Sequence, residues 1–598
     1  MQNQSEQLSS ETRTQFVSEH FVDRDEILDE LQEWATQFPK QSASTHALIG
    51  RRRTGKTSIL MKLYEYLFYK QQTVLPVFIT FEDFLLREGP ISTLEYIETF
   101  LGGYIASYAA FRLRQPELLT IANKWDRLRE IVEPQADDLL QELYQRFDRL
   151  VVDNDANRLA SFARGLPTDP TWYAQQKKMP TIVIIDEFQM VTQVHHPVLD
   201  RIRSMTGAYV SAVESLVAPM LVSGSAVSLL VNRALADGLS GRIGGFYYVD
   251  PLPQKYTHDL VFRLAAEYKL KADEAFAEMV WKVTKGYPYS VYCLMATKSP
   301  ERKKYPNLDA LNKVVEFELT NSRGQLWHHY GSEFAKYSEE LNDGLTTRKV
   351  MFWATKYPKK RIDVKQIAKT IGETEATVRA SLEKLQWVDI VMRVGLRSHE
   401  GPSDPMLRRF IEYEYYLEIE ELSPKEALKD WHQEFLSLQG SVNKFVGHVA
   451  EGYVYAILSG FDGRTVQGKR YFNLDQDVIL PPFTKIERRG GIVQKNKPFE
   501  MDLICEYALP NGGIGAWMVQ VKYWKDPVGE KEIREFLDSV QRIANEKGYA
   551  DVTRWYFCKQ GYRAKAEAML KQHGVLYSML EEFNAFAKLF DFFGLPED

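Results

Sequence analysis

Residues that bind phosphate groups stand together near the N-terminus, in 47-ALIGRRRTGKTSILM-61. The spacing Gly-x-x-x-x-Gly-Lys-Thr runs from Gly50 to Thr57, between a short apolar run and a helical pattern. Such glycines let several backbone N–H groups converge on phosphate oxygens where a helix begins, and the helix dipole favours the anion. Lys56 would reach the β- and γ-phosphates, and the Thr57 hydroxyl would bind Mg²⁺. The segment predicts a site for ATP and Mg²⁺, to which Thr54, Gly55 and Ser58 also contribute.

A second apolar run, 181-TIVII-185, ends in two carboxylates, Asp186 and Glu187. Consecutive apolar and β-branched residues predict a buried strand of the parallel type. Asp186 would hold the water shell of Mg²⁺, and Glu187 would orient or deprotonate the attacking water. Together with the phosphate-binding segment, the pair predicts a site that hydrolyses ATP.

Two further residues are candidates for the same site. The apolar segment 219–230 ends in Ser223 and Ser225, where a polar group could sense the γ-phosphate, and Ser225 is the preferred candidate. Arg242 precedes another apolar run. It acts as an arginine finger or is an ordinary surface residue, and the sequence leaves both interpretations open.

A second group of polar residues lies in apolar segments near the C-terminus. In 517-WMVQVKYW-524, Gln520 and Lys522 share one face of a predicted strand, because alternate residues of a strand point to the same side. The turn signal just before this strand, Asn-Gly in 509-LPNGGIG-515, predicts a hairpin with the strand expected over 497–507. That hairpin would bring Asp502 beside Gln520 and Lys522.

Glu451 could join this group from the largely apolar helical segment 445–460. Asp502 and the side-chain carbonyl of Gln520 are oxygen ligands suited to Mg²⁺ or Mn²⁺. Lys522 would position an attacking water and stabilise negative charge on a phosphate. The group predicts a metal-dependent phosphodiesterase site. The alternative is a buried ion pair between Asp502 and Lys522 in an inactive domain.

These sites need several domains to position them. A chain of 598 residues is too long for one hydrophobic core, and its 44% hydrophobic and 26% charged residues are typical of a soluble globular protein. No apolar run is long enough to span a bilayer, and the polar N-terminus has no signal-peptide pattern, so we expect a cytoplasmic protein without a membrane partner. Three scattered cysteines argue against a disulfide scaffold and a zinc site.

The net charge of −6 restricts any contact with nucleic acid to local basic surface. Candidate basic segments are 299–305, 357–365 and 486-IERRGG-491, each of which could equally be a solvated loop. The histidines His195, His196 and His448 have no neighbours in sequence that complete a metal site, so we interpret them as ordinary surface or core residues.

Residues 341–415 have the pattern of short helices followed by a strand. One helix is predicted over 363–372, a second begins after Thr374, a suitable N-cap, and a strand is predicted over 387–395. This order indicates a winged helix-turn-helix. Its second helix would face DNA with Arg379, Ser381 and Lys384, unless the module serves packing or regulation.

The N-terminal motifs resemble those of the archaeal-type AAA+ ATPases related to the STAND signalling class. The opening 21-FVDRDEILDELQEW-34 is similar to the segment with which that family contacts adenine. In 285-KGYPYSVYCL-294, Gly286 and Pro288 match the Gly-x-Pro element of the family's lid. The resemblance covers about residues 20–330 and implies a parallel-sheet P-loop ATPase domain, a helical lid and a winged helix after it.

From about residue 440 to 590 the chain resembles the PD-(D/E)XK nuclease superfamily, above all the Mrr-like restriction endonucleases. The shared order is a helix with Glu451, then Asp502, a hairpin, and Gln520-x-Lys522. Segment 551–583 also follows the family, as a strand, a turn, a helix and a short strand. The resemblance implies a C-terminal α/β restriction-endonuclease-like domain in which these four residues cut DNA with Mg²⁺ or Mn²⁺.

The predicted fold is therefore α/β and multidomain. The parts are an ATPase domain (1–255) with a helical insertion at about 85–175, a lid (256–335), a winged helix (336–420) and a nuclease domain (421–598). We expect an ATP-hydrolysing, metal-dependent DNA endonuclease in prokaryotic defence against, or processing of, foreign DNA. The alternatives are an ATP-switched sensor or scaffold with an inactive nuclease domain, and a winged-helix DNA-binding regulator. A homo-oligomer and an activating ligand or partner protein are compatible with each.

Overall fold

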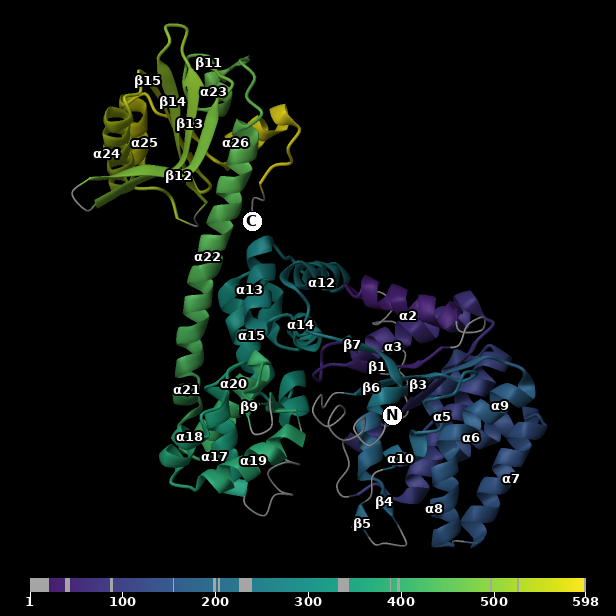
Figure 1. Cartoon of the computed structure of the whole chain (residues 1–598). Helices are drawn as coiled ribbons and strands as arrows, with labels where there is room; N and C mark the ends of the chain where they lie inside the picture. The colour runs from purple at the N-terminus through teal and green to yellow at the C-terminus, as the bar shows by residue number, and fades with distance from the viewer. Residues whose placement is uncertain are drawn as a thin grey trace. The chain divides into compact units, whose positions relative to one another are not determined.

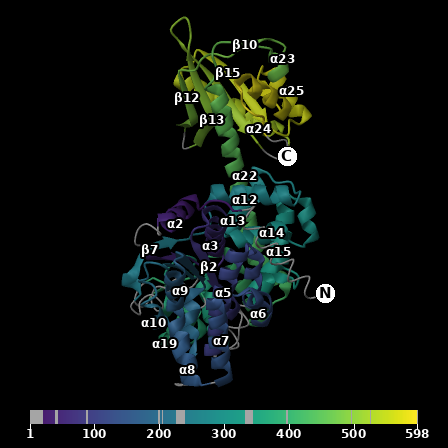
Figure 2. The same ribbon diagram turned by 90° about the vertical axis from the view of Figure 1, so that its right-hand side faces the viewer.

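The structure is a computed structural model that describes residues 21–37, 43–85, 90–153, 155–196, 201–202, 205–224, 239–331, 344–387, 389–394, 398–494, 497–523 and 526–595. Figures 1 and 2 show the chain from two sides. It divides into two compact units, one of residues 1–272 and 280–433 and the other of residues 273–279 and 434–598. No helix in the described ranges combines the length and the apolar character that crossing a bilayer requires.

Five parallel strands form the central sheet of the first unit. Their order is β2-β3-β6-β1-β7, with every neighbouring pair parallel. All residues of β3 and β6 are buried, as expected for central strands that are covered on both faces. The parallel sheet predicted from the sequence is therefore confirmed. The bounds are β1 (Thr45–Ile49), β2 (Leu75–Thr80), β3 (Thr181–Asp186), β6 (Met220–Gly224) and β7 (Ile243–Tyr248).

Helices pack against this sheet and fill the long connection between β2 and β3. The longest of them, α5, is buried along most of its length and packs on β2. Its neighbours α6, α7 and α8 lie beside it in Figure 1, in the stretch where the sequence predicts a helical insertion. The bounds are α2 (Asp25–Gln37), α3 (Lys56–Glu65), α4 (Glu82–Leu85), α5 (Thr93–Leu113), α6 (Trp125–Val132), α7 (Asp138–Asp153), α8 (Ala156–Gly165), α9 (Asp169–Lys177) and α10 (Thr206–Tyr209), with the short pair β4 (His195–His196) and β5 (Arg201–Ile202).

A helical stretch follows β7 and leads into three helices and a small antiparallel strand pair, β8 and β9. The strand predicted over 387–395 is wrong at its start, because the helix before it still includes Trp387. Val378, Leu382 and Leu385 carry the buried face of that helix to its last turn, which explains why it extends so far. The bounds are α12 (Gln254–Glu267), α13 (Glu274–Thr284), α14 (Pro288–Ala296), α15 (Leu308–Thr320), α17 (Gly344–Thr355), α18 (Val364–Ile371), α19 (Glu375–Trp387), β8 (Met392–Arg393), β9 (His399–Glu400), α20 (Pro405–Glu418) and α21 (Pro424–Ala427).

The C-terminal unit is built on a five-stranded mixed sheet of order β12-β13-β14-β15-β16. The pairs β12–β13 and β13–β14 are antiparallel, and the pairs β14–β15 and β15–β16 are parallel. The bounds are β10 (Thr465–Val466), α23 (Gly468–Tyr471), β11 (Val478–Ile479), β12 (Lys485–Gln494), β13 (Lys497–Ala508), β14 (Ile514–Lys522), α24 (Glu530–Lys547), β15 (Asp551–Cys558), α25 (Ala564–Gln572), β16 (Leu576–Ser578) and α26 (Leu580–Ala587).

Each face of this sheet has its own apolar core. Trp517, Val519 and Val521 of β14 pack with residues of α22 and α26. Met518 points to the opposite face and packs with residues of α24 and α25. Figure 1 shows these two pairs of helices on either side of the sheet. The alternation in β14 therefore places Gln520 and Lys522 on the face that α24 and α25 cover, as the period of two requires.

Helix α22 (Lys429–Leu458) is continuous over 30 residues. The helical segment predicted over 445–460 is only the second half of this helix, which begins at Lys429. The intervening residues contain no proline, and buried Phe435, Val442 and Ala450 continue one apolar stripe through them. The boundary between the two compact units falls inside this helix, after Gln433.

Candidate functional site

The residues of the N-terminal candidate site meet where β1 and β3 end. Lys56 is the first residue of α3, and Asp186 is the last residue of β3. Thr57 Oγ1 donates a hydrogen bond to Asp186 Oδ2 over 2.7 Å. Burial, and then the neighbouring carboxylate of Glu187, raises the pKa of Asp186. A divalent cation bound beside Thr57 and Asp186 would relieve this buried negative charge, which fits Mg²⁺.

Lys56 is buried inside the loop that precedes it. Its Nζ donates hydrogen bonds to the carbonyl oxygens of Gly50 and Arg51, each over 2.9 Å. Burial lowers the pKa of Lys56, and the nearby carboxylates Glu187 and Asp186 oppose this effect. The ammonium group therefore bonds to carbonyl oxygens of its own loop, and phosphate oxygens would compete with these carbonyls for it.

The backbone of this loop requires its two glycines. Gly55 has a φ of 94°, a left-handed conformation that side chains disfavour. A Cβ atom on Gly50 would lie 2.5 Å from the carbonyl oxygen of Val249. Thr54 closes the turn with a hydrogen bond from Oγ1 to the Arg51 carbonyl over 2.9 Å, and Ser58 follows in the first turn of α3. The loop residues chosen from the sequence thus form one tight turn at the start of α3.

Glu187 lies at the same edge of the sheet, in a left-handed conformation with a φ of 54°. A residue other than glycine in this conformation costs about 1–3 kcal/mol and is often found at functional sites. Its backbone N–H donates to Asp186 Oδ1 over 3.0 Å, and its carboxylate accepts a hydrogen bond from Gln189 Nε2. Ser223 is buried near the end of β6, whereas Ser225 lies outside the described residues.

Arg242 and Pro288 belong to other elements, the turn before β7 and the start of α14. Arg242 is exposed before β7, and its Nε donates to Glu214 Oε1 over 2.6 Å. This pairing fits the surface interpretation at least as well as the arginine finger. Pro288 is the first residue of α14, after Gly286 with a φ of 77°. A Cβ atom on Gly286 would lie 1.9 Å from the Leu252 carbonyl oxygen, so glycine is needed there.

The phosphate loop has a second set of contacts that the sequence analysis did not predict. The backbone N–H of Arg52 donates to Asp389 Oδ2 over 3.3 Å. Arg53 Nη1 lies 3.5 Å from Asp404 Oδ2, and the Arg53 guanidinium lies 4.3 Å above the ring of Tyr330. Three consecutive arginines in a phosphate loop were the available signal, since buried arginines need acidic or aromatic partners.

Asp389 presents a carboxylate to a backbone amide of the loop. It follows α19 in a left-handed conformation, with a φ of 64°. Burial raises the pKa of Asp389, while the positive charges of Arg51, Arg52 and Lys56 lower it. A negatively charged group is thus held where the phosphate loop would bind an anion.

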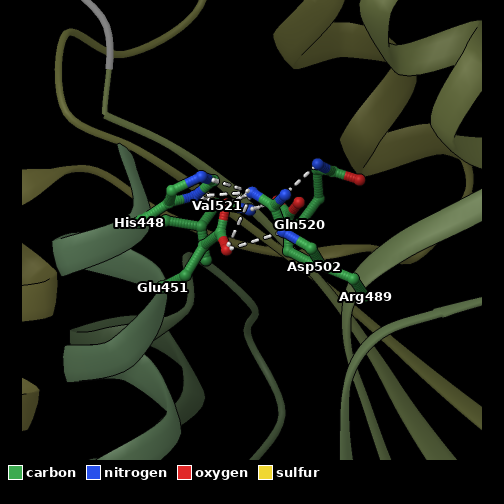
Figure 3. Close-up of polar contacts among 6 residues, drawn as sticks. All are labelled: His448, Glu451, Arg489, Asp502, Gln520 and Val521. Atoms are coloured by element: carbon green, nitrogen blue, oxygen red, sulfur yellow. Dashed lines mark hydrogen bonds and ion pairs between the residues drawn. The ribbon is translucent and has the colours of Figure 1, made fainter. Parts of the chain in front are cut away.

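The C-terminal candidate site lies where β13 and β14 separate. Their register ends with Leu503 opposite Val519, and Asp502 is the next residue of β13. Asp502 Oδ2 accepts the backbone N–H of Val521 over 2.7 Å and Nε2 of Gln520 over 2.5 Å (Figure 3). The hairpin brings Asp502 and Gln520 together, but Gln520 presents its amide nitrogen to Asp502, so its carbonyl must turn to bind a metal.

The charges around Asp502 change its ionisation. Burial raises the pKa of Asp502 to about 6, and the carboxylate of Glu451 adds to this effect. The hydrogen bond from Val521 and the charges of Lys522 and Arg489 act in the opposite direction. Lys522, at the end of β14, and Glu451, from α22, therefore both lie within electrostatic reach of Asp502.

Arg489 of β12 joins Glu451 in this site, and the sequence analysis did not single it out. Arg489 Nη2 lies 3.3 Å from Glu451 Oε1 and 2.5 Å from His448 Nδ1 (Figure 3). Glu451 is 7% exposed, whereas the Arg489 side chain is 48% exposed. The sequence predicts the basic segment 486–491 as nucleic-acid surface or as a solvated loop, and His448 as an ordinary surface or core residue. Only the fold shows that Arg489 and His448 both contact Glu451.

The donors of this site fit a hard divalent cation. Asp502, Glu451 and the Gln520 amide supply oxygen atoms, which Mg²⁺ and Mn²⁺ prefer. The guanidinium of Arg489 is a cation already bound to one of these carboxylates. Within the described ranges, no group of three or more His, Cys, Asp or Glu side chains could hold a metal. An ion here would therefore take its remaining ligands from Gln520, the backbone and water.

The predicted DNA contacts of α19 are only partly accessible. The prediction that Ser381 contacts DNA is wrong. Ser381 is only 3% exposed, and its hydroxyl accepts a hydrogen bond from Thr347 Oγ1 over 3.4 Å. Its position on the same face as Val378 and Leu382 explains the burial. Arg379 pairs with Glu375 over 3.4 Å, and Lys384 is exposed.

Comparison with known proteins gives similarity to solved structures only. No protein-family model and no curated protein matches the chain. A Walker-type ATPase of Pyrococcus abyssi is 16% identical, with a TM-score of 0.44, over 65% of this chain and 96% of its own. The ORC2 protein of Aeropyrum pernix is 10% identical, with a TM-score of 0.37, over 65% of this chain and 92% of its own. The RuvB Holliday junction branch migration motor of Thermotoga maritima is 13% identical, with a TM-score of 0.30, over 64% and 92%.

Proposed function

We propose that this chain binds and hydrolyses ATP and, through its C-terminal domain, cuts DNA with the help of a divalent cation. The single observation that carries the ATPase assignment is the meeting of Lys56, Thr57 and Asp186 where β1 and β3 end. Glu187, one residue further, would orient the attacking water. Because β1, β6 and β3 run parallel in one sheet, their carboxyl ends lie at the same edge, which supports this assignment.

The nuclease assignment is supported by the separation of β13 and β14 around Asp502, Gln520 and Lys522. A bound Mg²⁺ or Mn²⁺ would supply Lewis acidity toward a phosphodiester. Asp502 and Glu451 would hold it, and Lys522 would steady the negative charge that develops on the phosphate. The mixed sheet with helices on both faces suits a restriction-endonuclease-like domain. Defence against, or processing of, foreign DNA in a prokaryote is the biological role that we infer for this pairing of domains.

The test is cleavage of plasmid and linear DNA by the purified full-length chain. We expect cleavage with Mg²⁺ or Mn²⁺ and none with a chelator, and reactions with and without ATP will show whether the nucleotide controls it. A matched single-stranded RNA distinguishes the two nucleic acids. If no DNA is cut with either metal while ATP is still hydrolysed, the nuclease half of the proposal fails and the ATPase half remains.

A nucleotide-switched sensor is a second candidate function, because the phosphate loop contacts the region that we interpret as a winged helix. Asp389 and Asp404 of that region hold Arg52 and Arg53 of the loop. Phosphate groups that bind the loop would compete with the Asp389 carboxylate. Nucleotide binding would then loosen the winged helix, and oligomerisation or an activating partner could follow from that release.

This contact gives a prediction for Asp389. The variant Asp389→Asn should bind a fluorescent ATP analogue about tenfold more tightly, because it removes a negative charge that competes with phosphate. The matched control is Glu383→Gln, which neutralises an exposed acid on α19. Equal affinities for Asp389→Asn and the unaltered protein would mean that the carboxylate does not compete with the nucleotide.

A further inference from the structure

Among the basic residues of β12 that the structure describes, Arg489 is the one that lies opposite Asp502. The register pairs Arg488 with Leu503 and Gly490 with Met501, so that Arg489 falls opposite Asp502 on the neighbouring strand. Its backbone is left-handed, with a φ of 54°, although a glycine follows directly. A strained arginine beside a carboxylate indicates that its side chain is needed in this place.

The guanidinium of Arg489 binds the helix side of the site. Its Nε lies 3.4 Å from Glu451 Oε2 and its Nη2 lies 3.3 Å from Glu451 Oε1, which makes the pair bidentate (Figure 3). His448, one turn earlier on α22, contacts the same nitrogen. By contrast, the neighbouring Arg488 lies 5.9 Å from the ring of Tyr455 and has no such contact with the carboxylates.

Glu451 and Asp502 repel each other, and a cation has to compensate for this. Burial raises the pKa of Asp502, the Glu451 carboxylate adds to this effect, and the positive charge of Arg489 lowers the pKa. Two carboxylates that influence each other in this way are stabilised by a nearby positive charge, from a metal ion or from a side chain. Lys522 supplies charge from β14, but the described contacts of Glu451 are with Arg489 and His448.

We propose that Arg489 takes the place of the divalent cation between Glu451 and Asp502, and that it must leave Glu451 before the ion binds there. This inference rests on the proposed nuclease site and adds a residue that controls its metal affinity. Arg489 binds the carboxylate oxygens of Glu451, so the ion has to displace it. The arginine therefore weakens metal binding and keeps the site closed to metal until the ion concentration is high enough.

The test is titration of Mn²⁺ into the full-length chain without DNA or nucleotide, followed by calorimetry. The variant Arg489→Ala should bind Mn²⁺ at least about tenfold more tightly than the unaltered protein, because a competing positive charge is gone. Arg489→Lys, which keeps the charge but loses the bidentate geometry, should lie between the two. Arg488→Ala is the matched control and should leave the affinity unchanged. Asp502→Asn removes a ligand of the C-terminal site, so the Mn²⁺ binding that remains in this variant belongs to the N-terminal site.

Two outcomes overturn the inference. One is equal or weaker Mn²⁺ binding by Arg489→Ala together with an unchanged melting temperature, and the other is equal tightening by Arg488→Ala. Arg489→Lys serves as the second variant if Arg489→Ala does not fold. Tighter binding by Arg489→Ala without DNA cleavage by the unaltered protein would support the inference and refute the nuclease function. Cleavage by the unaltered protein, with no change of metal affinity in Arg489→Ala, would support the nuclease function and refute the inference.

Discussion

Replacing Lys56 with alanine should reduce ATP hydrolysis by at least about 100-fold, the usual loss when one preorganised donor to a phosphate is removed. Lys56 is the only lysine in the phosphate segment 50–58, and its buried Nζ already lies among the carbonyl oxygens that line the loop. Release of inorganic phosphate measures the rate, and a fluorescent ATP analogue measures binding. Both should fall, because the ammonium group contacts phosphates before and during the reaction.

The matched control for this prediction is Lys62→Ala. Lys62 lies on the same helix α3, but its Nζ pairs with Glu65 over 3.1 Å instead of facing the loop. Its removal should leave hydrolysis within about twofold, since a pair of this kind contributes little. Equal hydrolysis by Lys56→Ala and the unaltered protein would show that the loop has no part in ATP turnover.

Replacing Lys522 with methionine should abolish DNA cleavage, with a loss of at least about 100-fold. Methionine keeps much of the apolar length of the side chain and removes only the charge that would stabilise the phosphate. Binding of Mn²⁺ should persist, because Lys522 is not among the oxygen donors of Asp502, Glu451 and Gln520. Supercoiled plasmid, with gel analysis of nicked and linear products, measures cleavage.

Two comparisons separate catalysis from a structural role. Lys531→Met removes an exposed lysine of α24 and should cleave normally. If Lys522 is only the ion-pair partner of Asp502, then Lys522→Met should lower the melting temperature, and neither the variant nor the unaltered protein should cut DNA. In that case the C-terminal domain would be an inactive nuclease fold and the sensor would become the favoured function.

The sequence alone determined the parts of the two sites that depend on local patterns. Glycine and lysine spacing predicted the phosphate loop, because backbone conformation and a helix start are decided within a few residues. A short apolar run ending in Asp186 predicted a buried strand with a carboxylate at its end. The period of two in 517–522 and the Asn-Gly turn predicted the contact between Asp502 and Gln520, because a short hairpin fixes its own register.

Only the tertiary structure decided which distant groups share these sites. Arg52 and Asp389 are 337 residues apart, and Arg489 and Glu451 are 38 apart on different elements. No periodicity connects such residues, because their contact depends on how whole helices and strands pack. Ser381 was placed on the wrong face for a similar reason, since the packing of α19 against its neighbours decides which side of the helix is buried. Local spacing could therefore predict the reactive residues, whereas the charges that oppose them, Asp389 at the phosphate loop and Arg489 beside Glu451, are brought there by long-range packing.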